Sequence, residues 1–390
     1  MFRINLLLIF MALFSACNLH AGQKEIVVGA AQPGEYLPLI SGKSVGLVVN
    51  NTSRVGDVHL VDFLLKNSVD VQKIFAPEHG FRGDISAGGE VKDGVDTKTG
   101  LPVFSLYGEN KKPTAEHLKD VDVMIFDIQD VGCRFYTYIS TLHYVLEACA
   151  EHDIPLIVFD RPNPNGDYVA GPIRKAGFES FVSLDPIPIV HGCTVGELAQ
   201  MINGENWYSG DRKCELTVIP VLNYDHKMTY SLPVRPSPNL PNDLSIRLYP
   251  SLCFFEATSV SVGRGTDFPF QVLGGLKADL GDFEFTPRSI PGVAINPLNK
   301  DKKCFGVDLR ELKEVPEFTL KYFLDFYQKY SVESEFLTRE RWLNLLAGTD
   351  DLIIQIREGK SEEQILKSWQ AELEQYKQFR KKYLLYPDFE

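Results

Sequence analysis

The stretch Asp122-Val123-Met124-Ile125-Phe126-Asp127-Ile128 decides the fold class of this chain. Its continuous apolar run is typical of a strand that is buried on both faces, as in the centre of a parallel sheet. Other apolar runs of strand-like length lie before and after it. They cover residues 44–50, 69–75, 101–106, 154–160 and 216–221.

Segments with helical spacing separate these runs. Residues 57–66 place apolar side chains three and four positions apart, and residues 137–151 and 194–202 also have a helical pattern. In the last segment, Thr194 and Glu197 have the spacing of a capping box. This repeated β-α-β order predicts an α/β fold, with a Rossmann-like, doubly wound parallel sheet.

The composition changes after residue 232. Residues 232–250 contain five prolines, and because proline breaks helices and internal strands we expect a linker there. Beyond the linker the β-α alternation is lost, which indicates a second, smaller α+β domain. Its predicted elements are strands at 254–262 and 305–309 and helices at 319–330 and 361–382.

The N-terminus has the pattern of an export signal. Met1-Phe2-Arg3 supplies a short positive region, and residues 6–14 form an apolar core too short to span a bilayer. Lipidation of Cys17 and ordinary cleavage before Gly22 both fit the sequence. Both ways of processing the signal predict an exported protein, which is either periplasmic or anchored to a membrane as a lipoprotein. The predicted division is a signal peptide at 1–21, a Rossmann-like catalytic domain at 22–240 and an auxiliary domain at 241–390.

The composition excludes several classes of function. A formal net charge of -12 and a pI near 5.3 argue against nucleic acid as a partner. No GxGxxG follows the first strand, no HExxH occurs, and the cysteines lack zinc-ligand spacing. We therefore expect no cofactor and no metal. The six cysteines after Cys17 are widely spaced, so disulfides and buried free thiols both fit.

The first group of candidate site residues is Ala76-Pro77-Glu78-His79-Gly80-Phe81-Arg82-Gly83. It directly follows a predicted strand, and ligands of open α/β sheets bind at the carboxyl ends of the strands. An acid beside an imidazole and a guanidinium can transfer a proton while the cation holds an anion. The alternative is an ordinary polar surface turn.

A second group follows the strand at 122–128. It contains Asp127, Asp130, Arg134, Tyr136 and Tyr138. Taken one at a time, the aspartates are explained as helix caps and the tyrosines as core residues. As a set at the same sheet edge as Glu78, they indicate a pocket.

Further candidates lie in later loops. Arg161 and Asn163 follow the strand at 154–160, in a stretch that also reads as a plain turn. His191 follows an extended run and is more commonly a structural residue there. Asn239 in the linker and Arg264 in a Gly-Arg-Gly turn can close the cleft from its other side.

Together these blocks resemble the exo-β-N-acetylmuramidases of the NamZ type, over residues 42–390. Cys193 departs from the family pattern, where we expect Met. The blocks occur in the expected order: Pro77-Glu78-His79-Gly80, residues 127–138, Arg161-Pro162-Asn163-Pro164, His191-Gly192-Cys193-Thr194-Val195-Gly196-Glu197-Leu198, Ser237-Pro238-Asn239-Leu240-Pro241 and Gly263-Arg264-Gly265-Thr266.

The resemblance implies a Rossmann-like domain joined to an auxiliary domain, and an enzyme that releases N-acetylmuramic acid from the non-reducing end of peptidoglycan fragments. It implies Glu78 as the first catalytic residue, assisted by Tyr136 before Tyr138. Protonation of the leaving oxygen by an acid suits glycoside cleavage. The second role is open between Asp127 or Asp130, a tyrosine nucleophile, and the 2-acetamido group of the substrate.

Muramic acid also carries a lactyl carboxylate, for which a guanidinium is the natural partner. Arg82, Arg134 and Arg264 are equal candidates for this contact. The other predicted substrate-binding residues are His79, Tyr138, Arg161, Asn163, His191 and Asn239. A non-catalytic lipoprotein that binds cell-wall sugars, and an esterase or amidase acting on the lactyl-peptide part, are the alternative functions.

Overall fold

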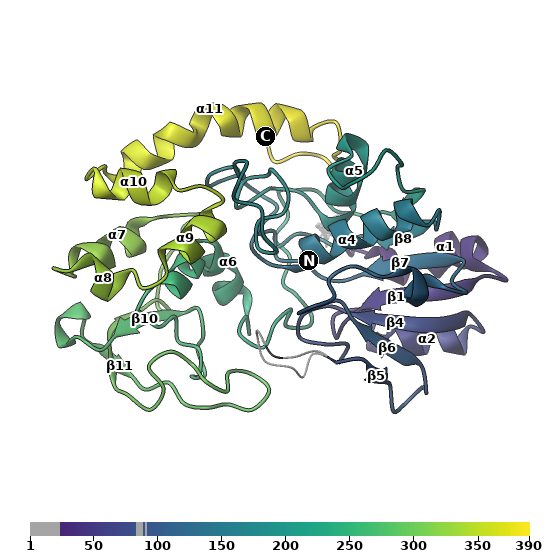
Figure 1. Cartoon of the computed structure of the whole chain (residues 1–390), viewed down its shortest axis with the longest axis horizontal. Coiled ribbons are helices and arrows are strands. Elements are labelled where there is room, and N and C mark those ends of the chain that lie inside the picture. Colours follow the sequence, from purple (N-terminus) through teal and green to yellow (C-terminus); the bar gives the residue numbers. More distant parts are fainter. Residues whose placement is uncertain (1–23, 83–88, 90–91) are drawn as a thin grey trace, which may run out of the picture.

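A seven-stranded sheet forms the centre of the N-terminal half of the protein (Figure 1). The computed structural model describes residues 24–82, 89 and 92–390. The strands lie in the order β5-β6-β4-β1-β7-β8-β9, and all neighbours are parallel except β5 and β6. Their bounds are Ser44–Val49 (β1), Asp70–Ala76 (β4), Gly94–Val95 (β5), Pro102–Ser105 (β6), Val123–Asp127 (β7), Leu156–Phe159 (β8) and Leu216–Ile219 (β9).

This strand order is the one expected for a Rossmann-like, doubly wound sheet. The first strand, β1, is central: the chain builds outward to β4 and β6 on one side, then to β7, β8 and β9 on the other. Val49 at the end of β1 pairs with Asp127 at the end of β7. The carboxyl ends of the central strands therefore meet at one edge, where the strand order reverses and ligands bind in such sheets.

Helices cover both faces of the sheet, which explains why its central strands β1, β7 and β8 are largely apolar. On β7, Val123 and Ile125 belong to the core layer beneath α1 and α2, whereas Met124 and Phe126 belong to the layer beneath α4 and α5. Successive side chains of a strand point to opposite faces, so both sets must be apolar. The helices are Pro33–Ile40 (α1), Leu60–Lys66 (α2), Ala115–Leu118 (α3), Tyr138–Glu151 (α4) and Val195–Glu205 (α5).

Two local predictions in this half have different outcomes. The capping box of α5 is confirmed: Thr194 Oγ1 accepts from the Glu197 backbone N–H at 3.3 Å, and Glu197 Oε2 accepts from the Thr194 N–H at 2.8 Å. The helix predicted at 57–66 begins only at Leu60. The preceding residues form a small hairpin instead, whose strands are Arg54–Val55 (β2) and Val58–His59 (β3).

The C-terminal half forms a smaller domain with its own antiparallel sheet, in the order β10-β12-β11. A cluster of phenylalanines that includes Phe254, Phe255 and Phe323 fills its core. The strands are Val272–Gly275 (β10), Phe283–Phe285 (β11) and Cys304–Asp308 (β12). The helices are Asp243–Leu252 (α6), Lys321–Gln328 (α7), Glu333–Phe336 (α8), Glu340–Ala347 (α9), Asp351–Arg357 (α10) and Glu362–Arg380 (α11). Three short 3-10 helices complete the described elements: Gly29–Ala31 (η1), Cys253–Ala257 (η2) and Ala278–Leu280 (η3).

Two predictions near the linker were wrong. Residues 243–252 form α6, which Asn242 caps, and Pro250 is accommodated close to its C-terminal end. The strand predicted at 254–262 begins as the 3-10 helix η2, because the aromatic residues there pack into a helical core and not into a sheet.

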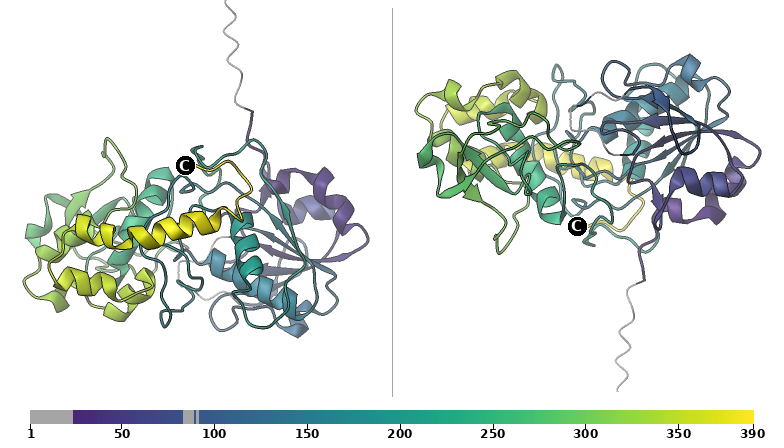
Figure 2. Two further views of the ribbon diagram at one scale, coloured as in Figure 1. Left: turned by 90° about the horizontal axis from the view of Figure 1, so that it is seen from above. Right: turned by 90° about the horizontal axis from the view of Figure 1, so that it is seen from below.

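Helix α11 ties the two halves together. It runs above both of them in Figure 1, and the view from above shows it reaching from one to the other (Figure 2). The chain then ends against the first half: Leu385 N–H donates to Glu197 Oε1 at 2.8 Å, and Tyr386 Oη donates to Asp160 Oδ2 at 2.5 Å. The domain boundary after residue 240 stays a prediction.

The six cysteines from Cys133 to Cys304 are buried free thiols. In the described part of the chain there is no cluster of metal-binding side chains, and no helix is long and apolar enough to cross a membrane. The predicted signal peptide at 1–21, with Cys17, lies outside the described residues.

Candidate active site

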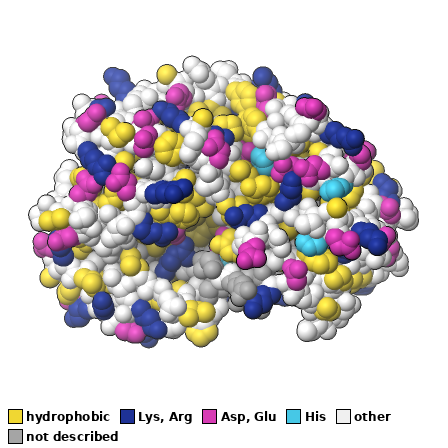
Figure 3. Space-filling model, viewed as in Figure 1, with side chains coloured by type: hydrophobic (Ala, Val, Ile, Leu, Met, Phe, Trp, Pro, Cys, Tyr) yellow, Lys and Arg dark blue, Asp and Glu magenta, His cyan; other side chains and the backbone are white. Residues whose placement is uncertain are grey.

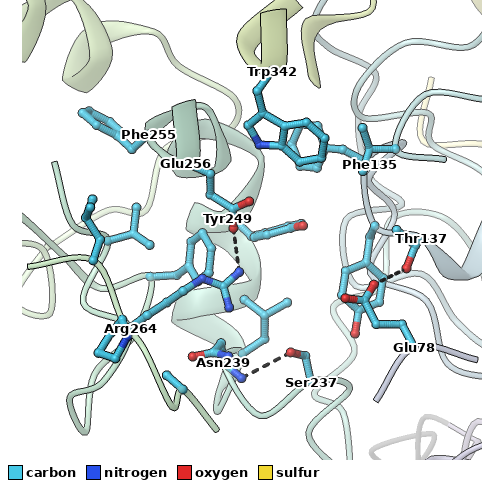
Figure 4. Close-up of a pocket in the computed structure, with 18 of the residues that line it drawn as sticks. Glu78, Phe135, Thr137, Ser237, Asn239, Tyr249, Phe255, Glu256, Arg264 and Trp342 are labelled. Carbon is cyan, nitrogen blue, oxygen red and sulfur yellow. Dashed lines mark hydrogen bonds and ion pairs between the residues drawn. The ribbon is translucent and has the colours of Figure 1, made fainter. Parts of the chain in front are cut away.

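A cleft of ≈ 1090 Å³ lies between the two halves of the molecule. Figure 3 shows the surface hollowed near its middle, with apolar and basic side chains around the hollow. One wall comes from the loops at the carboxyl edge of the large sheet and the other from the C-terminal domain (Figure 4). The polar and aromatic residues of these walls include Glu78, His79, Tyr107, Tyr136 and Thr137 on the first and Tyr249, Glu256, Arg264, Arg339 and Trp342 on the second.

Glu78 lies on the loop that follows β4. Its Oε2 accepts a hydrogen bond from Thr137 Oγ1 at 2.6 Å, and the two side chains project from the same wall (Figure 4). The backbone turns sharply at the next two residues, because His79 (φ 72°) and Gly80 (φ 76°) are both left-handed. Gly80 N–H closes this turn on the Pro77 carbonyl at 3.0 Å. A histidine in the left-handed region is uncommon, so the backbone is strained directly after Glu78.

Three tyrosines lie close to Glu78. Tyr138 Oη is 3.4 Å from the Glu78 carbonyl and donates to the Pro236 carbonyl at 3.1 Å, and Tyr136 Oη donates to the same carbonyl at 2.8 Å. Burial raises the pKa of each of these two phenols. Burial, the charge of Glu78 and a side-chain hydrogen bond to Glu78 raise the pKa of Tyr107. All three phenols are therefore neutral hydrogen-bonding groups at neutral pH.

The opposite wall carries a fixed cation. Arg264 Nη2 donates to Glu256 Oε1 at 2.6 Å, and its guanidinium lies 5.0 Å from the centre of the Phe270 ring. Glu256 stands on η2, at the place where the sequence predicted a strand. Glu78 and Glu256 thus face each other across the cleft, and they are the acidic residues that line it within the described chain (Figure 4).

Asn239 lines the cleft between the two walls. Its N–H donates to Ser237 Oγ at 3.2 Å, and its Nδ2 donates to the Val293 carbonyl at 3.1 Å, which joins the linker to the loop at residues 293–298. Its Oδ1 is buried and has no hydrogen-bond partner within the described chain. The linker therefore contributes a polar residue to the cleft, and substrate binding by Asn239 stays a prediction.

Asp127 and Arg161, predicted as site residues, do not line the cleft. Arg161 Nε donates to Asp127 Oδ1 at 2.6 Å and Nη2 donates to Oδ2 at 2.9 Å, and both side chains are buried. Asn163 is also buried, where its Nδ2 donates to the Cys193 carbonyl at 2.8 Å. Asp127 and Arg161 therefore join the end of β7 to the loop after β8, and Asn163 joins that loop to the segment before α5.

Asp130 and His191 form a second buried pair away from the cleft lining. The two side chains approach within 4.0 Å, and Asp130 Oδ2 accepts from the Gly132 N–H at 2.6 Å. Burial raises the pKa of Asp130 to about 7 and lowers the pKa of His191 to about 3. Neither group faces the cleft, so we no longer consider Asp130 for the second catalytic role.

The three arginines that the sequence left as equal candidates for the lactyl carboxylate have different surroundings in the structure. Arg82 Nη2 binds both carboxylate oxygens of Asp96, at 3.0 and 2.9 Å. Arg134 is fully buried and donates to the carbonyls of Pro172, Ile187 and Leu346. Of these three, Arg264 is the one that lines the cleft.

The lining residues that were not singled out from the sequence include Tyr107, Thr137, Glu256 and Trp342. Tyr107 follows β6, the neighbour of β4 in the sheet, so its place at the strand ends was a usable signal. Thr137 lay inside the block at 127–138. Glu256 on η2 and Trp342 on α9 had no such signal, because they reach the cleft only through the packing of the two domains.

The comparisons with known proteins agree with this architecture. Residues 45–244 match the family described as exo-beta-N-acetylmuramidase NamZ, N-terminal, and residues 247–386 match its C-terminal counterpart. The chain is 40% identical over 376 residues, 90% of this chain and 89% of the relative, to the peptidoglycan beta-N-acetylmuramidase NamZ of Bacillus subtilis (strain 168).

Two crystal structures of DUF1343 family proteins from Bacteroides fragilis NCTC 9343 have the same fold. One superposes with a TM-score of 0.87 at 45% identity, covering 94% of this chain and 100% of that chain. The other has a TM-score of 0.80 at 29% identity, covering 93% and 99%. With both halves of the chain matched in order, this protein belongs to the NamZ family of exo-β-N-acetylmuramidases.

Proposed function

We propose that this protein is an exo-β-N-acetylmuramidase, which hydrolyses the glycosidic bond of a terminal N-acetylmuramic acid in peptidoglycan fragments. The observation that carries the proposal is the carboxyl group of Glu78 in a cleft between two domains, hydrogen-bonded by Thr137. A positioned carboxylic acid can protonate the leaving oxygen of a glycoside. The named activity of the Bacillus subtilis relative supports the same reaction.

In this mechanism Glu78 is the general acid. Thr137 and Tyr107 hold its carboxyl group toward the cleft by hydrogen bonds, so the proton is delivered in one direction. The C-terminal domain forms the other side of the sugar-binding site. Its aromatic residues Tyr249 and Trp342 offer flat apolar faces to the sugar rings.

For the second catalytic role we favour the 2-acetamido group of the substrate. A tyrosine nucleophile must ionise, and burial raises the pKa of Tyr136 and Tyr138. Asp127 is paired with Arg161 in the interior, and Glu256 is paired with Arg264. Substrate-assisted cleavage is one of the known exceptions to the scheme with two carboxylates.

We also propose that the protein acts outside the cytoplasm. The charged start and apolar core of residues 1–21 support export, and Cys17 supports attachment to a membrane through a lipid. The site of action then coincides with the cell wall that supplies the substrate.

The test of the proposed function uses the chain from Gly22 onward, without the targeting segment, and the disaccharide of N-acetylmuramic acid linked β-1,4 to N-acetylglucosamine. Release of both monosaccharides, identified by mass spectrometry, supports the proposal. Saturable binding without product over a long incubation would favour a sugar-binding protein instead. Loss of only the lactyl or peptide part would favour an esterase or amidase.

A further inference from the structure

Three cationic side chains line the cleft within the described chain, and only one of them has an ion-pair partner there. Lys111 lies 5.2 Å from the centre of the Phe181 ring and Arg339 lies 5.1 Å from that of Trp342. Neither forms an ion pair among the described residues. Arg264 has both an ion pair and a ring contact, so its guanidinium is held at a defined place in the wall.

The turn that presents Arg264 is itself tightly specified. Gly263 (φ 81°) and Gly265 (φ 82°) flank the arginine in the left-handed region. A Cβ on Gly265 would lie 2.5 Å from the Arg288 carbonyl oxygen, so no larger residue fits there without movement. Thr266 Oγ1 donates to the Gly263 carbonyl at 2.6 Å and closes the turn. The Gly-Arg-Gly-Thr sequence is therefore a rigid support for one side chain.

The guanidinium keeps donors for a ligand. Its Nη2 bonds to Glu256, while Nε and Nη1 have no hydrogen-bond partner within the described chain. The side chain is 25% exposed, so these donors are reachable from the cleft. A guanidinium has five N–H donors in a planar fork and matches a carboxylate well. The site thus offers a fixed cation with free donors on the wall opposite Glu78 (Figure 4).

We propose that Arg264 binds the lactyl carboxylate of the terminal N-acetylmuramic acid and sets the preference for this sugar over N-acetylglucosamine. The two sugars differ only by the lactyl ether on O3, so a contact to its carboxylate distinguishes them. Glu256 is the positioning residue that aims the guanidinium. The arrangement also keeps the carboxylate of the substrate on the wall away from Glu78. The inference rests on the proposed function and names its specificity determinant.

The experiment compares aryl β-glycosides of N-acetylmuramic acid and of N-acetylglucosamine on the wild type and on Arg264→Gln. For the muramic acid substrate we expect kcat/KM to fall roughly 10- to 100-fold in the variant, the range for loss of a charge-assisted hydrogen bond. For the glucosamine substrate we expect little change. An equal loss on both substrates, or no loss on either, overturns the inference.

Three controls sharpen this comparison. Arg339→Gln removes another cation from the same cleft and should leave the ratio of the two kcat/KM values unchanged. Glu256→Gln should raise KM for the muramic acid substrate while kcat is kept, as expected for a positioning residue. If Arg264→Gln does not fold, the methyl ester of the lactyl group on the wild type serves instead: it should be cleaved as poorly as the variant cleaves the acid, and equal rates for ester and acid would contradict the inference.

A binding measurement separates this inference from the proposed function. Calorimetry with free N-acetylmuramic acid tests the wild type and Arg264→Gln without any turnover. If the wild type cleaves neither glycoside but binds the sugar in an Arg264-dependent way, the muramidase proposal fails and the inference stands. If cleavage occurs while both proteins bind the sugar equally, the inference fails alone. If the wild type neither cleaves the glycosides nor binds the sugar, both proposals fail.

Discussion

Thr137 Oγ1 donates a hydrogen bond of 2.6 Å to Glu78 Oε2 and so joins residues that are 59 positions apart in the chain. Thr137 precedes α4 at its N-cap position, and Glu78 follows β4. The bond couples two loops of the same sheet edge and fixes the direction of the carboxyl group. This contact is the basis for the first two predictions.

Glu78→Gln should remove most of the turnover and leave the fold intact. The amide has nearly the same shape but cannot donate the proton, and loss of a general acid typically costs about 10²–10⁴-fold in rate. Single-turnover assays on the muramic acid disaccharide check the rate, and circular dichroism checks the fold. Activity near that of the wild type would remove Glu78 from the mechanism.

Thr137→Val should lower kcat by about tenfold, because one hydrogen bond of roughly 1–1.5 kcal/mol no longer orients the carboxyl group. KM should change little, since the lost group holds Glu78 and not the substrate. Thr137→Ser keeps the hydroxyl and should restore most of the rate. A serine variant as slow as the valine variant would show that the hydroxyl is not the important feature.

Asp127→Asn should destabilise the protein without a specific effect on catalysis. The change leaves the buried Arg161 guanidinium without its carboxylate, and breaking a buried ion pair costs about 3–5 kcal/mol. Denaturant unfolding measures this loss. The kcat of the folded fraction should match the wild type, whereas a loss of kcat larger than 100-fold in folded protein would return Asp127 to the catalytic residues.

Asp130→Asn should alter the pH dependence of stability. Burial raises the pKa of Asp130 from 3.8 to about 7. Well below pH 3.8 the carboxyl is protonated in both the folded and the unfolded state, so it does not change the free energy of unfolding. As pH rises to 7 the unfolded state ionises first, so the folded wild type loses stability, by up to about 4 kcal/mol. The asparagine variant escapes this loss, and its stability relative to the wild type should increase between pH 4 and 7.

Urea unfolding of both proteins across this pH range measures the difference. His191, whose pKa burial lowers to about 3, is present in both proteins, and its opposite pH dependence largely cancels. A constant difference between the two proteins from pH 4 to 8 would contradict the assignment.

A thiazoline analogue of N-acetylmuramic acid should inhibit competitively and more tightly than the free sugar. It mimics the cyclic intermediate formed when the 2-acetamido oxygen attacks the anomeric carbon, and intermediate analogues bind more tightly than substrates. Inhibition constants for the analogue and for the free sugar provide the measurement. Equal affinity of the two would argue for a nucleophile supplied by the protein.

Which helices and strands could be predicted depends on how clearly the sequence pattern of each one differs from other patterns. The strands β1, β4, β7 and β8 were recognised because strands covered on both faces carry long apolar runs, although β4 also contains Asp70, Gln72 and Lys73. Helix α6 was missed because Pro250 and the four prolines that precede the helix resemble the composition of a linker. The helix η2 was mistaken for a strand because its aromatic residues favour both environments.

For the site, the sequence by itself determined which polar residues lie at the carboxyl edge of the sheet, since chain order and strand periodicity place Glu78, Asp127 and Arg161 there. Only the tertiary structure decided the surroundings of these three residues. Asp127 and Arg161 form an ion pair in the interior, whereas Glu78 lines the cleft. It also placed Arg264 and Glu256 opposite Glu78. The physical reason is that local patterns encode burial and periodicity, whereas the partner of a polar side chain depends on long-range packing between loops and domains.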